Sequence, residues 1–96
     1  MPTRAEILLK RDDIIHLAEL HGARNVRLFG SVSRDESTPS SDVDLLVSLD
    51  HGRSMLDRIA LIQELQDLLR CKVDVVNDRA LAPSMREDVL AEAVPL

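Results

Sequence analysis

The chain contains 96 residues, of which 45% are hydrophobic and 30% are charged, and its formal net charge at pH 7 is -5. A chain of this length forms one domain that buries roughly two-thirds of the surface its unfolded form exposes, so we expect a single domain over residues 1–96. The acidic balance argues against direct binding of nucleic acid, which requires a basic surface. It does not exclude a single nucleotide, because a divalent cation can neutralise a triphosphate.

The N-terminal segment is predicted to form one helix over residues 4–21. Thr3 and Glu6 have the spacing of a capping box, in which each side chain bonds to the other residue's backbone N–H. Gly22 follows the segment, and glycine commonly ends a helix because it adopts a positive φ. The apolar residues that recur at helical spacing are Ile7, Leu8, Ile14, Ile15 and Ala18.

A polar segment separates two predicted strands. Residues 25–29 and 43–49 are short apolar runs, whereas residues 31–41 have no sustained hydrophobic pattern and are expected to form a loop. Because side chains alternate along a strand, Val26 and Leu28 should face the same side of the sheet.

The C-terminal half predicts a helix, a strand and a short helix. Ser54 and Asp57 can cap a helix that continues to about residue 70. A strand over 72–76 follows, and a second capping box over 84–87 begins a helix to about residue 93. The order α-β-β-α-β-α indicates an α/β (α+β) fold, in which a small mixed β-sheet carries helices mainly on one face.

The sequence also indicates the cellular compartment in which the protein is expected. Cys71 is the only cysteine, so no internal disulfide can form, which fits a reducing cytoplasm. No apolar stretch approaches the roughly 20 residues needed to cross a bilayer, and the N-terminus lacks the apolar core of a signal peptide. We therefore expect a cytoplasmic protein with no membrane contact.

Two aspartates at the start of the second strand are candidate metal ligands. Asp42 and Asp44 are two residues apart, so their carboxylates point to the same face and repel each other unless a cation lies between them. Mg²⁺ binds one or two protein carboxylates together with substrate phosphates and water. The alternative is that Asp42 is a turn residue and Asp44 is solvated, since short motifs also match by chance.

The residues after the first strand are candidates for binding phosphate. Gly30 lets the backbone approach a ligand closely, Ser31 offers a hydroxyl and an N–H, and Arg34 lies one helical turn further on. The alternative is an ordinary glycine between strand and loop, with Arg34 a surface residue paired with Asp35 or Glu36.

Asp74 is a third candidate, because it interrupts an otherwise apolar strand. A buried charge without a partner is costly, and a position beside Asp42 and Asp44 would give it a role. There it could bind a second metal ion and act as a base toward an incoming hydroxyl. The alternative is an acid at the sheet edge that faces water.

Together these residues resemble the DNA polymerase β-like nucleotidyltransferases, and most closely the minimal nucleotidyltransferases (MNT proteins). The matching motifs are Gly-Ser-x-x-Arg at 30–34, Ser-Asp-x-Asp-Leu-Leu-Val at 41–47, and the third acid Asp74. The resemblance covers essentially the whole chain. It implies a nucleotidyltransferase fold that binds ATP with two Mg²⁺ ions. It further implies that the three aspartates are catalytic and ligate metal, and that Gly30, Ser31 and Arg34 hold the nucleotide.

The resemblance also implies a partner. Many MNT proteins are antitoxins paired with a HEPN-domain toxin, an RNase, which they silence by transferring AMP to a tyrosine. This chain would then be the adenylyltransferase of a type VII-like toxin–antitoxin pair, in a hetero-oligomer or as a homodimer. Two alternatives stay open: an antitoxin that acts by binding alone, and a nucleotidyltransferase for small molecules. The last is disfavoured because 96 residues leave no second domain to hold a substrate.

Overall fold

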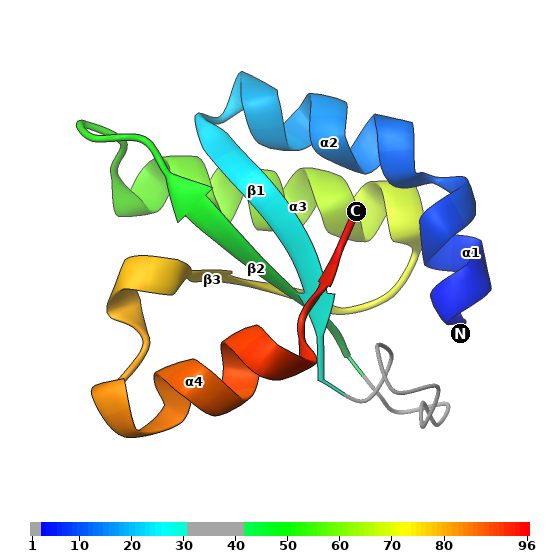
Figure 1. The fold of residues 1–96 in the computed structure, drawn as a ribbon. Coiled ribbons are helices and arrows are strands. Elements are labelled where there is room, and N and C mark those ends of the chain that lie inside the picture. Colours follow the sequence, from blue (N-terminus) through cyan, green and yellow to red (C-terminus); the bar gives the residue numbers. More distant parts are fainter. Residues whose placement is uncertain (1–2, 31–41) are drawn as a thin grey trace.

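The structure is a computed structural model that describes residues 3–30 and 42–96. Its sheet has the strand order β3-β2-β1-β4 (Figure 1). The strands are β1 (Ala23–Phe29), β2 (Val43–Leu49), β3 (Val73–Asn77) and β4 (Val94–Pro95). Strand β1 is antiparallel to both β2 and β4, whereas β2 and β3 are parallel. The predicted mixed sheet is therefore confirmed, with β4 as an unpredicted fourth strand.

The helices divide between core and periphery. They are α1 (Arg4–Leu9), α2 (Arg11–Leu20), α3 (Met55–Leu69), the 3-10 helix η1 (Asp78–Ala80) and α4 (Pro83–Glu92). Residues of α1, α2 and α3 contribute to one hydrophobic cluster with the strands, whereas α4 has no buried residue. The expectation of helices mainly on one face is confirmed. Within residues 3–30 and 42–96, no helix is long and apolar enough to cross a membrane.

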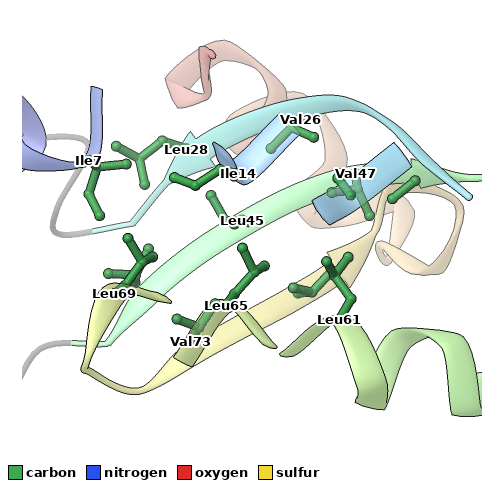
Figure 2. Packing of buried hydrophobic residues seen from close by; sticks show 14 of the residues in the cluster. Ile7, Ile14, Val26, Leu28, Leu45, Val47, Leu61, Leu65, Leu69 and Val73 are labelled. Carbon is green, nitrogen blue, oxygen red and sulfur yellow. The ribbon is translucent and has the colours of Figure 1, made fainter. Parts of the chain in front are cut away.

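The core lies between the sheet and the first three helices. On β2 the side chains of Val43, Leu45 and Val47 are buried in the main cluster, as Val73 and Val75 are on β3. Figure 2 shows Leu61, Leu65 and Leu69 of α3 packed against this layer. Side chains at the alternate positions of β2 and β3 point to the opposite face of the sheet, which we call the open face.

The prediction of one helix over 4–21 is wrong, because the segment breaks at Lys10 into α1 and α2. The Lys10 backbone N–H bonds to the carbonyls of Ile7 and Leu8, and its ammonium donates to the Leu68 carbonyl at 3.2 Å. Ile7 and Ile14, on either side of the break, are both fully buried. Tertiary packing therefore overrides an uninterrupted helical pattern.

The two capping boxes predicted in the C-terminal half had different outcomes. The box of Ser54 and Asp57 is confirmed at the start of α3. The box over 84–87 is wrong: the N-cap is Ala82 and not Ser84, so α4 begins two residues earlier than predicted, at Pro83, and has no side-chain cap. Proline is favoured in the first turn of a helix because its fixed φ suits the helix and its missing N–H needs no partner there. Ser84 therefore lies inside the helix.

Strand β3 is an edge strand whose outer side is covered by side chains of α3. The Val73 backbone N–H donates to Gln66 Oε1 at 3.2 Å, and Arg58 Nε donates to the Val75 carbonyl. Because β2 pairs with the other side of β3, these outward backbone groups would otherwise face water. The helix thus holds the edge of the sheet through side chains as well as through its apolar face.

Candidate active site

The sheet register brings two of the predicted aspartates together on the open face. Asp44 of β2 is the direct neighbour of Asp74 of β3 in the parallel pairing, and of Phe29 of β1 in the antiparallel pairing. Asp42 immediately precedes β2 and is exposed. The amino-terminal end of the β2–β3 pair therefore carries three carboxylates from two adjacent strands.

The electrostatics show that Asp74 and Asp42 act on Asp44. The pKa of Asp44 lies above its ordinary value, first because burial disfavours the charged form, and then because Asp74 and Asp42 place negative charge nearby. A cation at this point would relieve the repulsion, and oxygen ligands are those that Mg²⁺ prefers. The charge and the donor set therefore fit a magnesium ion held against Asp42 and Asp44.

Gly30 has a structural role in this arrangement that the sequence did not reveal. It has a φ of +78°, and a Cβ atom added there would lie 2.4 Å from Asp44 Oδ2. The glycine was predicted to let a ligand approach the backbone, whereas the group that approaches it here is the Asp44 carboxylate. Any side chain at position 30 would force that carboxylate to move. Ser31 and Arg34 lie outside the described residues, so their predicted contacts with phosphate stay predictions.

Asp74 has a partner that the sequence analysis missed. Arg58 Nη2 lies 3.2 Å from Asp74 Oδ1, with 35% and 51% of the two side chains exposed. The same guanidinium bonds to the Val75 carbonyl, so it reaches around the edge of β3 from α3. The sequence shows only that Arg58 is the single basic residue of α3, beside the apolar stripe of that helix. This pattern does not indicate which group the guanidinium contacts.

Among the residues that the structure describes, no three His, Cys, Asp or Glu side chains are arranged to hold one metal ion. The arrangement is therefore a carboxylate pair, Asp42 and Asp44, with Asp74 adjacent and ion-paired to Arg58. Such a pair leaves coordination positions for water and for the phosphates of a nucleotide. Chemically, the site can position a metal–triphosphate complex and accept a proton nearby.

The sequence profile of the nucleotidyltransferase domain matches residues 15–96. The chain belongs to this family. It is similar to the protein adenylyltransferase MntA of Thermococcus cleftensis, with 38% identity over 78 residues, covering 81% of this chain and 79% of the relative. It is also similar to MJ0435 of Methanocaldococcus jannaschii, which bears the name protein adenylyltransferase provisionally. Here the identity is 37% over 81 residues, covering 84% of this chain and 87% of the relative.

Solved structures agree with this assignment. One, provisionally described as a minimal nucleotidyltransferase, superposes with a TM-score of 0.90 at 44% identity and covers 99% of this chain and 97% of its own. A second, a toxin–antitoxin crystallised with AMP-PNP, gives a TM-score of 0.76 at 26% identity, covering 88% of this chain and 69% of its own. The predicted fold and the resemblance to the minimal nucleotidyltransferases are confirmed, and the chain is a nucleotidyltransferase.

Proposed function

We propose that this nucleotidyltransferase transfers AMP from ATP, with Mg²⁺, to a tyrosine hydroxyl of a HEPN-domain toxin and thereby acts as its antitoxin. The observation that carries the chemistry is the register of Asp44 and Asp74, which gathers negative charge on the open face. The relatives named protein adenylyltransferase support a protein as acceptor. The toxin–antitoxin crystallised with AMP-PNP, an analogue of ATP, supports the nucleotide and the kind of partner.

In this proposal each residue has a separate task. Asp42 and Asp44 hold the metal-bound triphosphate, while Gly30, Ser31 and Arg34 orient its phosphates. Bound magnesium would supply charge neutralisation of the triphosphate and of the leaving group. Asp74 takes the proton of the acceptor hydroxyl, whose oxygen forms a bond to the α-phosphorus as the bond to the bridging oxygen breaks and pyrophosphate leaves.

The exposure of the site supports an acceptor carried by another macromolecule. Asp42 is exposed, and about half of the Asp74 side chain is accessible. A hydroxyl on a protein surface can therefore approach the carboxylates without entering a deep cavity. Small-molecule substrates are instead bound in concave pockets that bury most of their surface.

The test is transfer of label from ATP labelled at the α-phosphate to a co-purified HEPN toxin, with magnesium present. We expect the double variant Asp42→Asn/Asp44→Asn to lose transfer, because it removes both proposed metal ligands. Asp67→Asn, an exposed acid of α3, is the matched control and should keep it. Transfer that persists in the double variant would contradict the assignment of the site. Full neutralisation of the toxin by the variant Asp42→Asn/Asp44→Asn/Asp74→Asn would mean that binding alone silences the toxin.

A further inference from the structure

A polar pocket lies at the opposite, carboxyl-terminal end of the β2–β3 pair. It has a volume of about 250 Å³, and its walls come from the start of β1, the end of β2, the turn after β2, η1 and α4. Ser48 is four residues beyond Asp44 on the same face of β2, which corresponds to about 13 Å along the strand. The pocket is therefore separate from the proposed catalytic carboxylates, although Ser48, one of the residues that line it, shares a face of β2 with Asp44.

Both acids that line this pocket are already matched by an arginine. Asp78 accepts hydrogen bonds from Arg27 Nη2 at 3.0 Å and from the Ser48 hydroxyl at 2.6 Å. Burial raises the pKa of Asp78, but the bonds from Ser48 and Arg27 and the positive charges of Arg27 and Arg86 outweigh it, so the pKa is lowered overall. Asp50 pairs with Arg24 at 2.7 Å. The two acids and these two arginines therefore cancel in charge.

Two further arginines of the pocket have no such partner. Arg79 donates to the Leu49 carbonyl and lies 3.2 Å from His51 Nδ1, and Arg86 donates to the Asp78 backbone carbonyl at 2.8 Å. Within the described part of the chain, neither guanidinium has a carboxylate at ion-pair distance. Backbone carbonyls fix their orientation while most of their N–H groups stay available. The pocket lining thus has three arginines against two aspartates, and Arg27, which pairs with Asp78 but does not line the pocket, raises the local excess to two positive charges. The whole chain, in contrast, has a net charge of -5.

We propose that this pocket binds a phosphate group, either as the free ion or as the phosphate of a nucleotide. Planar guanidinium groups bind phosphate through paired N–H donors, and two fixed ones provide a pre-organised receptor. The volume is below the roughly 300–1,000 Å³ typical of pockets for whole small molecules, so the phosphate rather than a complete nucleotide fills it. This site is distinct from the proposed catalytic one and does not depend on magnesium.

The proposal can be tested residue by residue with heteronuclear NMR. The full chain is titrated with inorganic phosphate in EDTA, and the backbone signals of 78–80 and the side-chain Nε signals of Arg79 and Arg86 are followed. We expect saturable shifts there, and affinity lowered at least about tenfold in Arg79→Gln/Arg86→Gln, because charged hydrogen bonds are lost. Arg11→Gln, which removes an exposed charge of α2 far from the pocket, should stay within about twofold of the wild type.

Further titrations distinguish the source of the phosphate from other anions. Tighter binding of AMP than of inorganic phosphate would identify a nucleotide as the ligand, and equal binding would identify the phosphate group alone. Adenosine should cause no shift. Acetate binding as tightly as phosphate, or phosphate affinity unchanged in the double variant, would overturn the proposal. If the double variant does not fold, Arg86→Gln serves instead, since Arg86 is exposed and makes one backbone contact.

Discussion

The two ends of the β2–β3 pair carry the same kind of residue with opposite consequences. At the amino-terminal end, Asp42 and Asp74 act on Asp44, the described part of the chain supplies one paired arginine, Arg58, and the pKa of Asp44 is raised. At the carboxyl-terminal end, Asp50 and Asp78 each have an arginine, and the pKa of Asp78 is lowered. The unmatched negative charge at the amino-terminal end suits a cation, whereas each acid at the carboxyl-terminal end is matched by an arginine and stabilises the fold. The charge left over at the carboxyl-terminal end is positive and belongs to Arg79 and Arg86.

The two ends of the β2–β3 pair should also differ in how their acids affect stability as the pH changes. A carboxyl whose pKa is raised by folding binds its proton more tightly in the folded state, so its effect on stability becomes less favourable as pH rises through the interval between the two pKa values. A carboxyl whose pKa is lowered by folding contributes stability above its unfolded pKa and loses it as pH falls through the folded pKa. Asp44 follows the first rule and Asp78 the second.

The largest effect is expected from Asp44→Asn. Adenylyl transfer should fall on the order of 10³-fold, because a proposed metal ligand is lost, yet the melting temperature at pH 7 should rise, because repulsion is relieved. The gain in stability should disappear below about pH 4, where the wild-type carboxyl is protonated in both states. Transfer assays and thermal melts at both pH values measure this. A lower melting temperature at pH 7 would contradict the account of Asp44.

The next effect is expected from Gly30→Ala, which displaces the Asp44 carboxylate. We expect transfer to fall by about 10²-fold, the order of loss that misplacing a catalytic group by 1 Å can cause. Gly52→Ala is the matched control, because Gly52 also has a positive φ, +86°, but has no atom within 4 Å of an added Cβ. Both variants should lose about 1 kcal/mol from backbone strain, and only Gly30→Ala should lose activity. Equal activity in the two would show that the close approach to Asp44 is unimportant.

A smaller effect, on stability alone, is expected from Asp78→Asn. The half-buried contacts with Arg27 and Ser48 are weakened, which should lower the free energy of unfolding by about 2 kcal/mol at pH 7. The deficit should shrink as pH falls below about 4. Asp50→Asn, whose pair with Arg24 is more exposed, should cost less than about 1 kcal/mol. Urea denaturation measures both, and equal losses would remove the distinction between the two pairs.

The smallest effect is expected from Arg58→Gln, which releases Asp74 from its partner. We expect kcat to fall several-fold with the KM for ATP unchanged, because Arg58 orients the proposed base rather than the nucleotide. Arg58→Lys should recover part of the loss. Arg53→Gln is the matched control, because it removes another partly exposed ion pair, the one with Asp57. It should leave kcat unchanged. A change in KM alone would place Arg58 in nucleotide binding.

The placement of Asp44 and Asp74 on one face could be predicted because it depends on local alternation. The two-residue spacing of Asp42 and Asp44, and the polar position of Asp74 between buried valines, determine which face they share. What could not be predicted depends on the neighbours in space. The contact of Gly30 with Asp44 follows from the pairing of β1 with β2, and the reach of Arg58 follows from β3 being an edge strand.

The same distinction applies to the fold. The apolar pattern predicted β2 and α3 well, because β2 is a short apolar run that is mostly buried and the buried residues of α3, Leu61, Leu65 and Leu69, recur at helical spacing. The break at Lys10 and the pairing of β4 with β1 depend on contacts between segments that are far apart in the sequence. The periodicity of a single segment holds no information about them.

The side chains of Gln66 and Arg58 on the outer edge of β3 have a consequence for self-association. An exposed edge strand is a template on which another chain can add a strand and start aggregation. Here the Val73 N–H and the Val75 carbonyl already have partners within the chain. An incoming strand would have to displace the Gln66 amide from the Val73 N–H and the Arg58 guanidinium from the Val75 carbonyl. The protein is thereby protected from polymerising through the strand that carries its third carboxylate.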